Sequence, residues 1–254
     1  MTAHDRRIRH TQARQRGDDK ITVRPVHYDL TRSQYLFSVM SIASAFALLI
    51  VYAARLAARV DLLNWWMPVA FAGGVAAADF ASGIVHWGAD TWGREDLPLI
   101  GRRLLVPFRV HHVNPEDFLR RSFVDTNGDV AGVAVPVLAA LVNVPLGAGW
   151  DGVAMFGFGF CGVGVLTNQI HQWAHMPAPP RLVQVAQSLG IVLGRVDHAV
   201  HHQQPHDAHY CITTGWCNRP LERIRFFRRL ESAVTLFTGQ RPREDDRRHI
   251  AVYG

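Results

Sequence analysis

The sequence predicts an all-α integral membrane protein with about four transmembrane helices. Three observations support this fold class. The chain of 254 residues contains four long apolar runs, its basic side chains fall almost entirely on one side of those runs, and most of its histidines cluster near their ends. We expect a disordered basic arm (residues 1–32), one membrane domain (33–236) and a charged C-terminal tail (237–254).

The first two runs lie close together in the chain. Residues 35–54 form a run of twenty residues without a charged side chain, enough for a helix to cross a hydrocarbon core of about 30 Å. Residues 62–78 follow a short basic link, with Trp65 and Trp66 at one edge, where aromatic side chains of membrane proteins gather. We predict one transmembrane helix in each run.

The third and fourth runs predict a helical hairpin. Residues 130–148 are uncharged despite Pro136 and Pro145, and a shorter run covers residues 152–166, with a turn at 149–151 between them. A soluble protein with buried helices is an alternative that the second and fourth runs alone would allow. The first and third runs favour the membrane protein.

The distribution of positive charge predicts the orientation of the spans. With four spans, the link between the first two runs and the 149–151 turn lie on the same side of the membrane. Of the 27 Lys and Arg residues, only Arg55 and Arg59 lie on that side. The positive-inside rule makes the other side, which holds both termini, cytoplasmic. The arginine-rich composition suggests a GC-rich bacterium and its inner membrane, or the endoplasmic reticulum in a eukaryotic host. The basic face is explained by insertion and lipid headgroups, so we expect no nucleic-acid binding.

Ten of the 14 histidines fall in five clusters at or just beyond the ends of the runs. The clusters are His86, with Asp90 four residues on; His111 and His112; His171 and His175; His198, His201 and His202; and His206 and His209. Side chains three or four residues apart share one face of a helix, so His171 with His175, and His198 with His201 and His202, each present several imidazoles to one point. Four spans bring all ten to the cytoplasmic membrane face, where we predict a metal site.

The number of histidines indicates two metals. One zinc ion uses about four ligands and a catalytic zinc about three, so a single ion would leave most of ten imidazoles unused. Imidazole binds iron, zinc and copper, and ligand type alone does not choose among them. Soluble di-iron bundles use mostly carboxylates, which are scarce in these clusters. Number and location favour two irons that activate dioxygen beside a lipid substrate.

Several long motifs surround the clusters. They are residues 79–83 (DFASG), 86–93 (HWGADTWG), 108–112 (FRVHH), 125–129 (DTNGD), 168–175 (NQIHQWAH), 198–202 (HAVHH), 205–206 (PH), 210–216 (YCITTGW) and Asn218. Together they resemble the plasmanylethanolamine desaturase family over roughly residues 71 to 231. The resemblance implies an iron- and oxygen-dependent membrane desaturase that inserts the vinyl-ether double bond at C1–C2 of the alkyl chain of 1-O-alkyl ethanolamine phospholipids, giving plasmalogens. A related plant branch desaturates an acyl chain of phosphatidylglycerol.

The resemblance also implies the metal ligands. These are His86, His111, His112, His171, His175, His198, His201 and His202, with Asp90 as the candidate carboxylate. Pro205 interrupts the helix before His206 and His209. These two histidines therefore have three possible roles: metal ligands, hydrogen-bond donors to ligands, or surface groups. Dioxygen takes four electrons and two C–H bonds supply two, so we expect an external donor, a ferredoxin or a cytochrome, to supply the others.

Polar residues near the clusters have two interpretations. Asp197 lies four residues before His201, where it either orients that imidazole or is a solvated surface charge. Asn168, Gln169 and Gln172 surround His171, and we expect them to support it rather than only pack helices. Structural roles are favoured for three other groups: Asp125 and Asp129 as a turn and helix start; Trp87, Trp92, Trp173 and Trp216 as anchors; and Cys161, Cys211 and Cys217 as buried apolar side chains.

Three alternative functions follow from the same features. A fatty-acyl desaturase or hydroxylase would use the same histidines with a different lipid tunnel. A metal transporter or sensor is disfavoured because the candidate ligands lie at the ends of the spans, not along a midplane path. A zinc hydrolase is disfavoured because the chain has no HExxH motif and too many ligands.

Overall fold

The computed structural model describes residues 25–147 and 149–253, and these residues form helices and connecting loops without a strand. A short π-helical turn, η1 (Gly101–Leu105), precedes α4. The helices are α2 (Arg32–Arg59), α3 (Met67–Thr91), α4 (Val106–Val113), α5 (Pro115–Leu119), α6 (Phe123–Leu141), α7 (Asp151–Gly164), α8 (Thr167–His175), α9 (Arg181–Ser188), α10 (Arg195–His201), α11 (Asn218–Arg223), α12 (Phe226–Thr238) and α13 (Glu244–Tyr253). The predicted all-α fold is confirmed for the described part of the chain.

Three helices, α2, α3 and α6, are long and apolar enough to cross a membrane. The helices α7 and α8 pass the same test together but are bent by 42° at the break between them. The described residues therefore contain three candidate spans, or four if the bent pair counts as one. This agrees with the four apolar runs in the sequence.

The helix bounds differ from the predicted runs in ways that matter for the site. The second run was expected at residues 62–78, but α3 begins at Met67 and continues to Thr91, so His86 and Asp90 lie within the helix. The third was expected at 130–148, but α6 begins at Phe123 because the Ser122 hydroxyl accepts the Asp125 N–H at 3.2 Å and caps it. Asp125 and Asp129 thus lie in the first two turns of α6, not before it.

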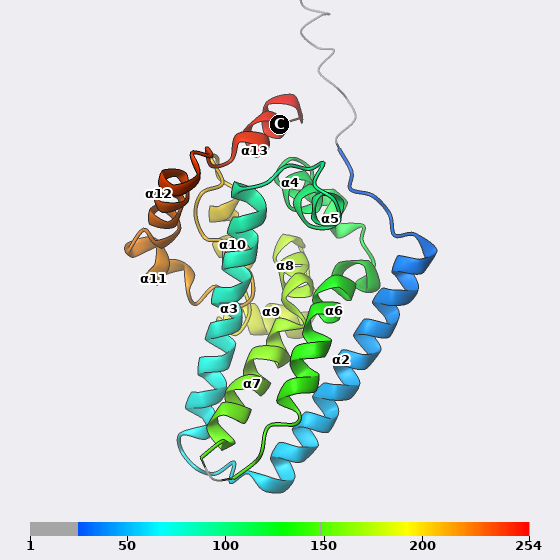
Figure 1. The fold of residues 1–254 in the computed structure, drawn as a ribbon, viewed down its shortest axis with the longest axis vertical. Coiled ribbons are helices and arrows are strands. Elements are labelled where there is room, and N and C mark those ends of the chain that lie inside the picture. Colours follow the sequence, from blue (N-terminus) through cyan, green and yellow to red (C-terminus); the bar gives the residue numbers. More distant parts are fainter. Residues whose placement is uncertain (1–24, 148, 254) are drawn as a thin grey trace, which may run out of the picture.

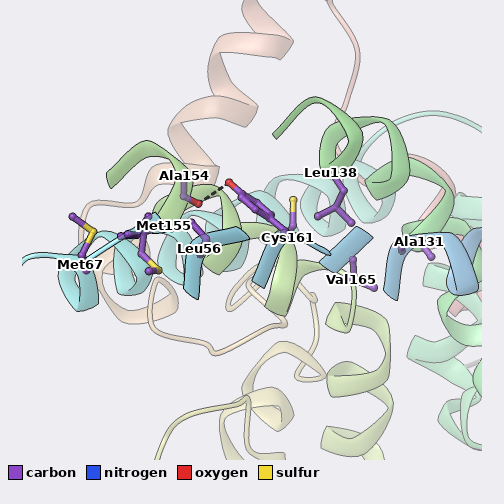
Figure 2. Packing of buried hydrophobic residues seen from close by; sticks show 11 residues of the cluster. Leu56, Met67, Ala131, Leu138, Ala154, Met155, Cys161 and Val165 are labelled. Atoms are coloured by element: carbon purple, nitrogen blue, oxygen red, sulfur yellow. Dashed lines mark hydrogen bonds between the residues drawn. The ribbon is translucent and has the colours of Figure 1, made fainter. Parts of the chain in front are cut away.

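The long helices form a bundle in which α3 packs along α7 and α2 along α6 (Figure 1). Its core contains Tyr52 and Leu56 of α2, Leu138 of α6 and Ala154 of α7. The buried Tyr52 hydroxyl donates to the Ala154 carbonyl at 2.7 Å, which satisfies its polar end in an apolar setting (Figure 2).

Glycines allow the closest helix approach in the bundle. A Cβ on Gly74 of α3 would lie 2.0 Å from the Phe156 carbonyl oxygen of α7. A Cβ on Gly159 of α7 would lie 2.3 Å from the Phe71 carbonyl oxygen of α3. Small residues at this interface therefore let the two backbones touch.

Both ends of the described chain contact the helical bundle. Residues 1–24 of the arm lie outside the described residues, but at residues 25–31 the Pro25 carbonyl accepts from Asn114 at 2.9 Å. At the other end, α13 packs on α3 and α4. The buried Arg243 pairs with Glu231 at 2.9 Å, and its N–H donates to the Thr91 carbonyl at 2.7 Å. The C-terminal segment is thus part of the helical domain.

Candidate metal centre

One end of the bundle brings together the eight histidines and the aspartate that the sequence predicts as ligands. They come from four segments: His86 and Asp90 from α3, His111 and His112 from α4, His171 and His175 from α8, and His198, His201 and His202 from α10 and its C-terminus. Figure 1 shows these helices converging near the top of the bundle. Spacings of three or four residues place His86 and Asp90, His171 and His175, and His198 with His201 and His202 each on one side of a helix.

The histidine side chains form two adjoining groups. The first group contains His111, His171, His175, His198 and His202, and the second contains His86, His111, His112 and His201. Within each group the possible ligand atoms lie within 4.8 Å of one another. His111 belongs to both groups, so the two candidate metal positions are neighbours.

The first group has a geometry that hydrogen bonds alone do not explain. Nε2 of His198 lies 2.9 Å from Nε2 of His171, 2.8 Å from that of His175 and 3.1 Å from that of His202. An imidazole nitrogen carries either one proton or one lone pair, so His198 cannot satisfy three such neighbours. Several lone pairs converging on one point is the arrangement that a metal cation requires.

The second group adds a carboxylate to the imidazoles. Oδ2 of Asp90 lies 3.1 Å from Nε2 of His86, 3.4 Å from that of His201 and 3.6 Å from that of His112. The Asp90 side chain is fully buried. In the described part of the chain neither of its oxygens has a hydrogen-bond partner, and neither does Nε2 of His86 or of His111. Leaving such buried atoms unsatisfied is costly, and bound metal ions would satisfy them.

Backbone carbonyls fix which nitrogen of three imidazoles faces the centre. Nδ1 of His86 donates to the Tyr210 carbonyl at 3.0 Å, Nδ1 of His201 to the Ala208 carbonyl at 2.9 Å, and Nδ1 of His111 to the Phe108 carbonyl. A carbonyl only accepts, so the proton lies on Nδ1 and the lone pair on Nε2. The donor set fits two adjacent metal ions held by Nε2 atoms and one carboxylate.

Burial keeps the imidazoles outside the candidate spans in the form that binds metal. Burial, and after it the neighbouring His86, lower the pKa of His201 to about 3. Burial also lowers the pKa of His111 and of His202, with other histidines as the next cause. These rings are therefore neutral at neutral pH, and no proton competes with a metal ion.

His206 and His209 lie outside both groups. The buried His206 ring stacks on that of His112, with centroids 4.3 Å apart. Both histidines have a positive φ, 60° and 56°, in the loop that follows α10. His206 thus contacts a candidate ligand, His112, without belonging to either group. The three possible roles of His206 and His209 remain those given by the sequence.

The polar residues near the clusters have defined contacts in the structure. The Asp197 side chain is 55% exposed and lies 3.9 Å from Arg219, which fits the solvated surface charge, one of its two interpretations. Gln172 donates to the carbonyls of Phe118 and Arg121, at 2.7 and 3.1 Å. Asn168 donates to the Thr126 carbonyl, and Gln169 donates to Gln172, at 3.0 and 2.9 Å. Through these contacts and the bond from Asn127 to Gln169 at 3.2 Å, the three amides join α8 to α5 and α6.

One positioning residue was missed in the sequence. The Asp79 carboxylate of α3 accepts N–H bonds from Thr214, Gly215 and Cys217 at 2.8 to 2.9 Å. It thereby fastens the loop that carries Tyr210, whose carbonyl orients His86. A carboxylate directly after an apolar run was the available signal, because buried charges need such partners.

A cavity of about 380 Å³ reaches the centre, with His111 and His171 in its wall. Much of the remaining wall is apolar, including Val130 and Val137 of α6. Val133 also lines the cavity and is 72% exposed, so the cavity is open at the side of α6. Charged side chains line another part of it: Arg102, Arg103, Arg121, Asp117, Asp125 and Asp129.

Comparisons with known proteins agree with the motifs. Residues 75–245 match the lipid desaturase domain. The chain is 41% identical over 184 residues to a plasmanylethanolamine desaturase of Myxococcus xanthus, covering 72% of this chain and 66% of that protein. It is 43% identical over 183 residues to plasmanylethanolamine desaturase 1 of Mus musculus, covering 68% of this chain and 66% of the relative.

A plant protein is similar at a greater distance. Fatty acid desaturase 4-like 1, chloroplastic, of Arabidopsis thaliana is 32% identical over 184 residues, covering 70% of this chain and 60% of that protein. The matched part of the chain thus spans less than two thirds of the length of each of these relatives. No solved structure matches the chain. The similarities confirm the resemblance carried by the histidine motifs.

Proposed function

The chain belongs to the lipid desaturase domain family, and on this premise we propose that it is an oxygen-dependent di-iron desaturase of 1-O-alkyl ethanolamine phospholipids. It would insert the vinyl-ether double bond at C1–C2 of the alkyl chain and yield plasmalogens. The named activity of the relatives from Myxococcus xanthus and Mus musculus supports this substrate class. The site is proposed to face the cytoplasm, in the bacterial inner membrane.

The observation that carries the proposal is that candidate metal ligands, charged side chains and apolar side chains all line one cavity. C1 of the alkyl chain is bonded to a glycerol oxygen, so the reacting carbons lie only a few bonds from the polar headgroup. Such a substrate needs charged side chains near the metal centre for its headgroup, and an apolar wall leading away from the centre for its alkyl chain. The cavity offers His111 and His171, then charged side chains such as Arg103, and an apolar stripe from Val130 to Val137 that extends about 10 Å along α6.

The side chains of the centre have defined tasks in this proposal. Eight imidazoles and Asp90 would hold two iron ions, which when bound supply the oxygen activation that removes one hydrogen from C1 and one from C2. The chain itself presents neutral Nε2 atoms, since backbone carbonyls hold the protons of His86 and His201 on Nδ1. Phe108 lies 4.8 Å from the His86 ring and Phe118 lies 5.0 Å from the His171 ring, between centroids, and both limit water near the reacting carbons.

Electron balance requires a partner. Reduction of one dioxygen to two waters takes four electrons, and the two C–H bonds supply two of them. We propose that a ferredoxin or a cytochrome supplies the other two at the arginine-rich face, where an acidic donor would be attracted.

The test is to express the chain in a host that makes alkyl-ether ethanolamine lipids but no plasmalogens. Acid-labile vinyl ethers are quantified by mass spectrometry in cells with the wild type, with His171→Ala and with His249→Gln, a histidine outside both groups. We expect vinyl ethers from the wild type and the His249 variant and none from equally abundant His171→Ala. If the wild type yields none despite iron, oxygen and a working donor, the substrate assignment fails. An acyl lipid, as the name of the Arabidopsis relative suggests, then becomes the leading substrate.

A further inference from the structure

The charged part of the cavity is built from two elements that face each other. In η1, Arg102 and Arg103 are consecutive, and in α6, Asp125 and Asp129 are one turn apart and share a face. Nη2 of Arg103 lies 2.6 Å from both oxygens of Asp129, and Arg102 lies 3.9 Å from the centroid of the Tyr28 ring. All four charged side chains line the cavity that reaches His111 and His171.

The charges in the cavity wall are balanced. Three arginines and three aspartates line it, namely Arg102, Arg103, Arg121, Asp117, Asp125 and Asp129. The innermost pairs are already matched, since Arg121 is buried and contacts Asp117 and Asp125 at 3.3 and 3.1 Å. A headgroup with net negative charge would favour a surplus of arginine, whereas a balanced wall fits a zwitterion that carries one phosphate and one ammonium.

The Arg103–Asp129 pair is the part of this wall that can open. The Asp129 side chain is 46% exposed and that of Arg103 is 27% exposed, so water screens the pair and little is lost when it separates. A zwitterionic headgroup placed between them would replace one ion pair by two, phosphate with Arg103 and ammonium with Asp129. The exposed Arg102 guanidinium adds a second cation for the phosphate.

We propose that Arg102, Arg103 and Asp129 form the headgroup site, in which the two arginines bind the phosphate and Asp129 binds the primary ammonium of an ethanolamine phospholipid. An ethanolamine ammonium donates up to three hydrogen bonds to carboxylate oxygens, whereas a choline headgroup has no N–H to donate. Asp129 therefore selects ethanolamine over choline, and the arginines contribute equally to both. The inference rests on the proposed function for the reaction that follows binding, but the binding itself needs no metal.

The experiment measures binding without turnover. Purified full-length protein in detergent is titrated with radiolabelled 1-O-hexadecyl glycerophosphoethanolamine and, separately, with its choline analogue. We expect the wild type to bind the ethanolamine lipid about tenfold more tightly, the difference made by a charge-assisted hydrogen bond. Asp129→Asn should lose this preference through weaker ethanolamine binding alone, and Asp129→Glu should regain part of it. Arg103→Gln should weaken binding of both lipids by a similar factor.

A matched control and a stability measurement separate binding from structure. Asp96→Asn removes a carboxylate from another arginine pair, with Arg94 at 2.7 Å, outside the cavity wall, and should leave both affinities unchanged. The inference is overturned if the wild type does not distinguish the two lipids. It is also overturned if Asp129→Asn weakens both equally while lowering the thermal stability, which is the result of a purely structural ion pair.

The outcome also distinguishes this inference from the proposed function. Selective binding in a protein that forms no vinyl ether would keep the headgroup site and reject the proposed reaction. Vinyl-ether formation by a protein that binds the two lipids equally would keep the proposed reaction and reject the headgroup site. Where turnover is measurable, Asp129→Asn should raise KM for the ethanolamine substrate about tenfold and leave kcat within twofold, since Asp129 does not touch the reacting carbons.

Discussion

At the scale of single residues, the centre depends on which nitrogen of each imidazole holds the proton. The carbonyls of Tyr210 and Ala208 fix this for His86 and His201. The candidate ligands could be named from sequence, through the histidine clusters and the family resemblance, and the structure brings their side chains together. The carbonyls could not, because their positions follow from a loop held by long-range contacts with Asp79, which no local pattern encodes.

Two aspartates near the histidines are expected to behave differently when neutralised. Asp90→Asn removes the only carboxylate among the candidate ligands and should lower the metal content of the purified protein by about one ion per chain, measured by plasma mass spectrometry. Asp197→Asn, the matched control, should leave the metal content unchanged, because that side chain is exposed beside Arg219. Equal losses in the two variants would show that Asp197 supports the centre after all.

At the scale of elements, hydropathy predicts that helices exist but not where they begin. Residues 79–91 follow the second apolar run and residues 123–129 precede the third, yet both stretches are helical, within α3 and α6. Their polar side chains have partners inside the protein: His86 and Asp90 lie in the centre, and Asp79 accepts from backbone N–H groups of the loop at residues 214–217. The helices α7 and α8 are bent by 42° at the break between them, and His171 and His175 of α8 join the other histidines in the first group.

The close approach of α3 and α7 makes a prediction for two glycines. Gly74→Ala would place a Cβ 2.0 Å from a backbone oxygen of the facing helix, whereas Gly162→Ala on α7 meets nothing within 4 Å. Both substitutions raise helix propensity alike, so their difference reports packing. We expect Gly74→Ala to lower the midpoint of thermal unfolding in detergent by about 5 °C, from an overpacking cost of about 2 kcal/mol. Gly162→Ala should keep the midpoint or raise it, and equal midpoints would contradict this packing.

At the scale of the whole molecule, one end of the bundle concentrates the chemistry. The histidines and the charged cavity wall lie there. The C-terminal helices gather at the same end, and the apolar helices extend from it (Figure 1). The sequence predicted the gathering of histidines, because a count of spans places them on one side. It did not predict the cavity or the packing of α13, since both arise from contacts between segments far apart in the chain.

The number of metal ions per chain tests the central claim most directly. We predict two iron ions in purified wild-type protein, measured by plasma mass spectrometry against protein concentration. His202→Ala, which affects one group, should retain about one ion, and His111→Ala, which affects both, should retain less than His202→Ala. A wild type that holds a single ion, or two variants with identical losses, would contradict a centre of two adjoining metal positions.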